Sequence, residues 1–265
     1  MTYLEVISKS VGHSRNLALF WLIVISSWSF IGCQRIESGR AESSASLQRI
    51  IIPKIVADIS IDARLNEPVW QQAARLSLAE KTGAKSGREA TEVRLWYDDE
   101  ALYLAWICSD SDIQATLTER DSRFWEEEVC EFFVTAGNLE QYFELQWNPL
   151  GGEFDAIIDN KLDGSGISNG IEGHWEFTAE SMESAVVVDG SVSDSSDIDV
   201  EWLAEVRVPF SDLNVTTPKP GETWRGNFYR FNRGSGFEEE LLAWSSVTLR
   251  SFHQPSQFGY LVFGE

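Results

Sequence analysis

Cysteine and histidine are both scarce in this sequence, with three of each among 265 residues. Cys33, Cys108 and Cys130 form no C-x-x-C pair and have no zinc-type spacing, so a cysteine-based zinc site is excluded. Cys108 and Cys130 follow or lie within apolar runs typical of strands. In an oxidising compartment the two could pair, but buried free thiols fit equally well, because spacing alone does not fix connectivity.

Basic residues are also few, at 21 against 42 acidic ones, which gives a formal net charge of −21. A chain with this charge repels the phosphates of nucleic acids and anionic lipid head groups. The composition therefore disfavours a nucleic-acid-binding function. The negative charge indicates nothing further about function, since acidic residues also keep a protein soluble.

Long apolar runs are limited to one, which lies between residues 17 and 32 behind Lys9 and Arg15. At about fifteen residues it is short for a membrane helix and typical of a secretory signal. It ends in Phe-Ile-Gly-Cys33, which resembles a bacterial lipobox, where the cysteine is lipidated and becomes the mature N-terminus. An uncleaved anchor helix is the alternative. Both interpretations predict export, with residues 1–33 as the signal.

Residues 34–52 are mainly small and polar in their first part and are predicted to form a flexible tether. Gln34 follows the predicted lipidation site. It is not the aspartate that retains similar lipoproteins at the inner membrane, so the resemblance favours the outer membrane or periplasm. Residues 53–265 are long enough for one domain with a sizeable core.

Strand patterns dominate residues 53–265, and only residues 66–74 resemble a short helix, capped by Asn66 or Glu67. Many short strands with turn-rich gaps predict an all-β fold, a distorted and mostly antiparallel β-sandwich. The strands are predicted at 58–65, 92–97, 102–108, 129–135, 142–148, 154–158, 175–180, 185–188, 202–209, 222–233 and 259–263.

Several motifs occur in an order that resembles the family 9 carbohydrate-binding modules. The resemblance covers residues 53–265 and lies in D-A-R-L-N-E-P-V-W at 62–70, E-V-R-L-W-Y-D-D at 92–99, W-E-E-E-V-C-E-F-F at 125–133, Y-F-E-L-Q-W-N-P-L-G at 142–151, W-R-G-N-F-Y-R at 224–230 and F-H-Q-P-S-Q-F-G at 252–259. It implies a β-sandwich that holds a sugar between two tryptophan faces, with structural calcium in some members and frequent attachment to glycoside hydrolases.

The sugar-binding rings are predicted by position. Trp125 lies before a strand in an acidic approach, Trp244 follows a polar loop, and Trp175 is the substitute for either. Flat rings suit the C–H faces of a pyranose. Burial in the core is the alternative for each ring. Six tryptophans lie within strand or helix patterns and are assigned to the core: Trp70, Trp96, Trp106, Trp147, Trp202 and Trp224.

Polar groups for the sugar hydroxyls are predicted at Arg120, Glu128, Asn148 and Arg233. Glu128 and Glu131 are three apart, so on a strand they face opposite sides. If Glu128 faces the sugar, Glu131 faces away and pairs with an arginine. Asn148 alternatively caps a turn.

A structural Ca²⁺ is the one cofactor that the resemblance suggests. Its predicted ligands are Asp58, Asp62 and Glu67. Turn and cap roles are the favoured alternative for these acids, because no EF-type loop is present.

Three other functions are open. The first is an enzyme. Ser168 lies in a G-x-S-x-G sequence, but a nucleophile elbow needs a strand, a sharp turn and a helix. Glycoside hydrolysis needs only two carboxylates at a set separation, and no motif in the sequence identifies such a pair. Haem binding would need axial ligands from His174, His253 or Met182. An envelope interaction domain with a degenerate sugar slot is the third. The sequence favours a non-catalytic domain that binds oligo- or polysaccharide.

Overall fold

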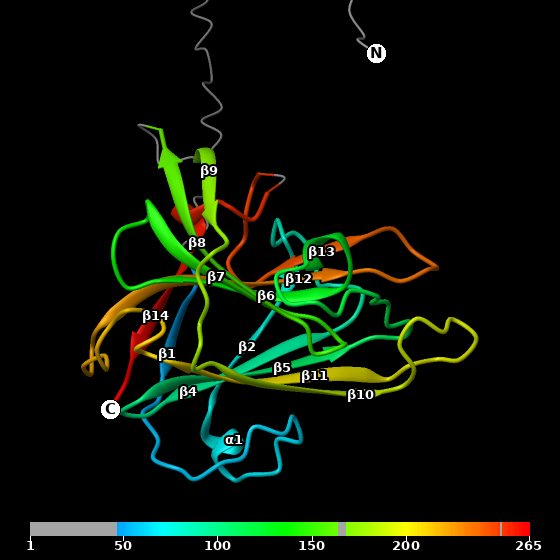
Figure 1. Cartoon of the computed structure of the whole chain (residues 1–265), viewed down its shortest axis with the longest axis horizontal. Coiled ribbons are helices and arrows are strands. Elements are labelled where there is room, and N and C mark those ends of the chain that lie inside the picture. Colours follow the sequence, from blue (N-terminus) through cyan, green and yellow to red (C-terminus); the bar gives the residue numbers. More distant parts are fainter. Residues whose placement is uncertain (1–46, 164–167, 250) are drawn as a thin grey trace, which may run out of the picture. The chain divides into compact units, whose positions relative to one another are not determined.

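Two mostly antiparallel sheets build the domain in the computed structural model, which describes residues 47–163, 168–249 and 251–265 (Figure 1). The first sheet has nine strands in the order β1-β14-β12-β6-β7-β8-β9, with β13 paired to β12 and β3 paired to β13. The second has five, in the order β10-β11-β5-β4-β2. The predicted all-β sandwich is confirmed.

The elements have these bounds: β1 Arg49–Ile52, α1 Val69–Gln72, β2 Ala74–Ser77, β3 Ala79–Glu80, β4 Thr91–Tyr97, β5 Ala101–Ser109, a 3₁₀ turn η1 Phe124–Glu126, β6 Val129–Thr135, β7 Gln141–Trp147, β8 Glu153–Leu162, β9 Ser168–His174, β10 Glu183–Asp189, β11 Glu201–Pro209, β12 Thr223–Asn232, β13 Glu240–Ala243, η2 Pro255–Gln257 and β14 Gly259–Phe263.

Alternation along the strands sorts side chains onto the two faces of each sheet. In β6, Cys130, Phe132 and Val134 point into the main core between the sheets, whereas Val129 and Phe133 join an apolar cluster on the outer face of the nine-stranded sheet. The outer face of the five-stranded sheet is covered by α1 and the chain before it, around Trp70. The fold therefore has three apolar layers, and the six predicted core tryptophans are all buried.

A buried ion-pair network crosses the main core. The Arg230 guanidinium donates to Glu128 at 2.8 Å and to Asp110 at 2.7 Å, and all three side chains are fully buried. Trp202 Nε1 also donates to Glu128. Every charge in this group has a partner, which is the condition for burying charges at all.

Several predicted boundaries need correction. Residues 49–52, which were assigned to the tether, form strand β1 and pair in parallel with β14. Residues 58–65 are not a strand, and they lie against Trp70 as irregular chain. Residues 175–180 are not a strand either; they form turns and irregular chain after β9, which ends at His174. The helix α1 begins after Pro68 without a side-chain cap.

Cys108 on β5 and Cys130 on β6 face each other between the sheets, with their sulfur atoms 3.3 Å apart and both thiols buried. We expect the two thiols to form a disulfide in protein that is kept under oxidising conditions. Mass spectrometry should then show the loss of two hydrogen atoms, and thiol titration should find neither cysteine free. The resulting bridge would stabilise the fold by about 3 kcal/mol, because it closes a loop of 22 residues. Cys108→Ser protein should lack this gain, and two titratable thiols in oxidised, denatured wild type would contradict the prediction.

Candidate functional site: an aromatic cavity over two glutamates

A cavity of about 470 Å³ lies on the outer face of the nine-stranded sheet, within the size range of small-molecule sites. Strands β6, β7 and β8 form its floor, and β9, β12, η1 and the chain before η2 supply its walls. Its lining residues are Trp125, Glu131, Phe133, Glu144, Phe154, Ile158, Ile171, Gly173, Trp175, Phe231, Ser251, Phe252 and His253.

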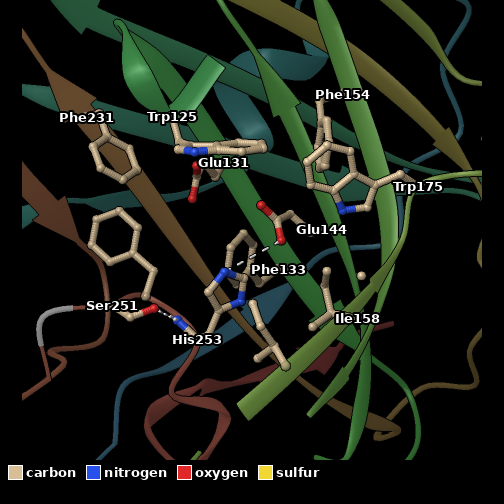
Figure 2. A pocket seen from close by; sticks show the side chains of 13 residues that line it. Trp125, Glu131, Phe133, Glu144, Phe154, Ile158, Trp175, Phe231, Ser251 and His253 are labelled. Atoms are coloured by element: carbon tan, nitrogen blue, oxygen red, sulfur yellow. Dashed lines mark hydrogen bonds and ion pairs between the residues drawn. The ribbon is translucent and has the colours of Figure 1, made fainter. Parts of the chain in front are cut away.

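The floor carries two carboxyl groups from adjacent strands. Glu131 on β6 pairs in register with Gln146, and Glu144 on β7 pairs with Phe133, so the two glutamates are diagonal neighbours on one face. Figure 2 shows both carboxyl groups directed into the cavity. They are 2% and 5% exposed, respectively.

Burial sets the protonation of this floor. It raises the pKa of Glu144 to about 7, against an opposing hydrogen bond from Gln146 Nε2 at 2.6 Å. Burial, followed by the charge of Glu144, raises the pKa of Glu131 well above its ordinary value, and Arg233 opposes this shift. The unliganded floor therefore retains protons near neutral pH.

His253 lies beside the glutamates. Its Nε2 is 4.0 Å from a Glu144 oxygen, and its Nδ1 shares a hydrogen bond of 2.6 Å with the Tyr142 hydroxyl. Burial lowers the pKa of His253 to about 4, so the imidazole is neutral at pH 7. It thus offers a neutral ring nitrogen, and no compensating charge, to a ligand.

Aromatic side chains form the walls. Trp125 from η1 meets Trp175, which directly follows β9, with ring centroids 5.7 Å apart and planes at 75°. Phe154 completes this corner at 5.4 Å from Trp125 and 5.6 Å from Trp175. Phe231 lies across the glutamates from Trp175 (Figure 2). At 45% exposure, Trp175 leaves much of its surface available.

The predicted sandwich of a sugar between Trp125 and Trp244 is not what the structure presents. Trp244 is 9% exposed and belongs to the main core, with its ring 5.8 Å from that of Phe228. Trp175 occupies the place beside Trp125 instead. A pyranose between two faces needs rings about 7–8 Å apart, since each contact takes 3.5–4.0 Å. The edge-to-face pair of Trp125 and Trp175 therefore forms a single wall of the cavity and does not enclose a sugar between two ring faces.

The predicted polar groups mostly have structural partners. Glu128 is in the buried network with Arg230, and Asn148 accepts hydrogen bonds from the Leu150 and Gly152 amides, as a turn cap does. Arg120 pairs with Glu153 and Asp155.

Arg233 pairs with Glu239, contacts the Glu127 carbonyl and lies over the Phe231 ring at 4.7 Å, so it borders the cavity without lining it.

Glu131 was expected to face away from the ligand and to pair with an arginine, and the structure reverses this assignment. Glu128 and Glu131 do face opposite sides, but Glu128 faces the core with the arginine and Glu131 faces the cavity. Sequence reasoning also missed Glu144 and the lining role of His253. The available signal was a glutamate within the largely apolar sequence of both β6 and β7.

The other candidate residues lie elsewhere. Ser168 begins strand β9 and is not followed by a helix, so it has no elbow geometry. His174 pairs with Asp159 at 2.9 Å, and Met182 packs against the main core, so of the three haem candidates only His253 lines the cavity.

Asp62 caps its own turn through the Arg64 amide, whereas one oxygen of Glu67 is buried without a hydrogen-bond partner. Asp58 borders a separate surface hollow. Within residues 47–163, 168–249 and 251–265, no three acidic, histidine or cysteine side chains converge in a way that could hold a metal ion. Calcium binding at Asp58, Asp62 and Glu67 stays a prediction.

Glu144 should make stability depend on pH. Between its ordinary pKa near 4.5 and its folded pKa of about 7, the folded protein holds a proton that the unfolded chain releases, so stability falls as pH rises through this window. We expect Glu144→Gln to raise the free energy of unfolding at pH 8 by about 1–3 kcal/mol, with the gain vanishing towards pH 4.5.

Urea titrations at pH 8, 6 and 4.5 measure this effect. Glu140→Gln, at an exposed turn, is the control and should change little. A Glu144→Gln protein that is less stable than wild type at pH 8 would show that the ionised carboxylate stabilises the fold.

Comparisons with known proteins agree with this architecture. The model of carbohydrate-binding family 9 matches residues 83–263. The crystal structure of a proposed carbohydrate-binding protein from Bacteroides uniformis has a TM-score of 0.66 at 17% identity, covering 82% of this chain and 100% of that one.

A family 9 module from Caldicellulosiruptor kristjanssonii in complex with cellotriose has a TM-score of 0.57 at 13% identity, covering 82% of this chain and 94% of the module. The same kind of module with glucose has a TM-score of 0.53 at 13% identity, covering 81% and 96%. No curated protein matches the chain. The family match extends over most of the sandwich, and the chain belongs to carbohydrate-binding family 9.

Proposed function

We propose that this protein is a non-catalytic carbohydrate-binding domain whose ligand occupies the cavity above Glu131 and Glu144. The observation that carries the proposal is the combination of partly exposed aromatic walls with a buried polar floor in one concave site. Sugars are amphipathic in the same way, with apolar C–H faces and a polar rim. The bound glucose and cellotriose of the Caldicellulosiruptor module give independent support.

The polar groups of the cavity suit sugar hydroxyls. Glu131 and Glu144 can accept hydrogen bonds when ionised or donate one when protonated, and the neutral His253 ring and the Ser251 hydroxyl add adaptable partners. The exposed part of the Trp175 ring offers a face to the C–H surface. Binding at this site would serve the breakdown of polysaccharide by separate enzymes.

A glycan screen with purified protein tests the proposal, with product analysis of each incubated glycan as the second measurement. We expect retention of at least one glycan that is recovered uncleaved. Recovery of shortened product would favour hydrolysis by the Glu131 and Glu144 carboxyl groups, and retention of no glycan would favour the degenerate envelope domain.

The location is also a proposal, because residues 1–46 lie outside the described residues. The apolar run before Cys33 supports a lipid anchor at that cysteine, with export to the periplasm or outer membrane. Within the described residues no helix has the length and apolarity to span a membrane.

Cys33→Ser tests the anchor. We expect the variant to accumulate as an unprocessed precursor that carries no lipid, because the thiol that accepts the lipid is missing. Metabolic labelling with a fatty acid and detergent phase partitioning measure the change. Cys108→Ser is the control and should be processed normally. Unaltered labelling of the Cys33→Ser protein would exclude lipidation at this position.

A further inference from the structure

The ionisable side chains that line the cavity are unbalanced in sign. Among the lining residues, two are acidic and none is lysine or arginine. His253 is the single base in the lining, and its low pKa leaves it neutral at pH 7. Arg233 lies outside the lining and is already held by Glu239 and the Glu127 carbonyl.

Glu131 is the least satisfied group in the site. Its carboxyl group faces the cavity at 2% exposure and has no hydrogen bond or ion pair within the described part of the chain. Glu144 receives one hydrogen bond, from Gln146, and the basic side chain beside it in the described part of the chain is His253, which is 4.0 Å away and neutral at pH 7. A buried carboxyl group without a partner is costly, and an arriving cation removes that cost.

The walls favour the same kind of ligand. Aromatic rings attract a cation at their faces, and aromatic cages are a common way to hold an ammonium group. Trp125, Trp175, Phe231 and Phe252 surround the two carboxyl groups. The neutral hydroxyls of an ordinary sugar would form hydrogen bonds here, but they bring no positive charge that could stabilise the ionised forms of the two glutamates.

We propose that the cavity selects sugars that carry a free amino group, with the ammonium placed between Glu131 and Glu144 and the ring against the aromatic walls. This inference rests on the proposed carbohydrate-binding function and specifies its ligand class as 2-amino-2-deoxyhexose units or their short oligomers. A hydroxyl or an acetamido group at the same carbon lacks the positive charge and should bind more weakly.

Proton linkage gives the selection a measurable signature. The unliganded floor holds protons near neutral pH, because burial and mutual repulsion raise the pKa values of both glutamates. An ammonium ion between them favours their ionised forms, so binding should release protons. Calorimetry in two buffers of different ionisation enthalpy measures this release. Tyr142, Tyr229 and His253 around the floor stay neutral at pH 7, and Arg233 contributes a positive charge that opposes the pKa shift of Glu131.

The experiment compares three trisaccharides with the same β-1,4 linkage: the trimer of glucosamine, the trimer of N-acetylglucosamine and cellotriose. We expect the glucosamine trimer to bind at least tenfold more tightly than the other two and to release protons. Glu131→Gln and Glu144→Gln should each remove most of this preference while retaining weak binding of cellotriose.

The acidity of the chain requires a control for general attraction. Glu140→Gln removes an exposed charge outside the cavity and should leave the preference unchanged, and 0.3 M salt should reduce it only modestly because buried pairs are poorly screened. Equal affinity for the three trimers, or an equal loss in the Glu140→Gln protein, would overturn the amino-sugar inference and leave carbohydrate binding intact. Failure of every sugar to bind would overturn both.

Discussion

Replacement of Trp175 by alanine should lower the affinity for any sugar ligand of the cavity by at least tenfold and leave the melting temperature nearly unchanged. The ring is 45% exposed and contributes a wall of the cavity, so its surface is available for a ligand. Covering an aromatic side chain gains about 1.5–3 kcal/mol, and 1.4 kcal/mol corresponds to a factor of ten in affinity.

Calorimetric titration of wild type and variant with the best ligand from the glycan screen measures this loss. Trp175→Phe retains an aromatic face and should keep part of the affinity. Val187→Ala removes another exposed apolar side chain, on β10 in the opposite sheet, and should bind like wild type. Unchanged affinity in the Trp175→Ala protein would place the ligand elsewhere on the domain.

The same substitution at Trp244 should have the opposite result, with a loss of about 3–5 kcal/mol in the free energy of unfolding. Trp244 lies in the main core against Phe228, and its ring covers Gly259 so closely that a β-carbon there would be 2.3 Å from a ring carbon. Removing the ring leaves a cavity that neighbouring strands cannot fill, because β12 and β14 are held in register.

Urea unfolding measures this loss, and ligand titration of the fraction that stays folded separates stability from binding. Trp244→Phe should recover more than half of the lost stability, because it fills part of the space. A stable Trp244→Ala protein that no longer binds sugar would restore Trp244 to the ligand site.

Strand positions were largely predictable from the sequence. The predicted limits of β6 and β14 agree with the structure to the residue, whereas β4 begins one residue earlier than predicted and β5 is one residue longer at each end. These strands alternate or are continuously apolar, and local pattern is a sufficient signal there. Strand β9 was missed because Ser, Asn and Gly in residues 168–174 have low strand propensity, and pairing with β8 overrides it.

The composition of the site was predictable only in part. Trp125 and the substitute ring Trp175 do line the cavity, whereas none of the four predicted polar residues does. Arg120 and Arg233 were chosen for their closeness along the chain to the two favoured rings, and Glu128 for its place in the strand pattern. Charged side chains on this surface find partners across strands instead, as Arg120 does with Asp155 on β8.

The sequence by itself determined the fold class, the family and the fact that Glu128 and Glu131 face opposite sides of one strand, because a period of two is a property of the backbone. It did not determine which side is inside. Which glutamate faces the core depends on Arg230, about a hundred residues later in the chain, because its buried guanidinium group donates a hydrogen bond to Glu128. Only the tertiary pairing of β6 with β12 and β7 therefore turned Glu131 outwards and placed Glu144 beside it, in the cavity that Trp175 also lines.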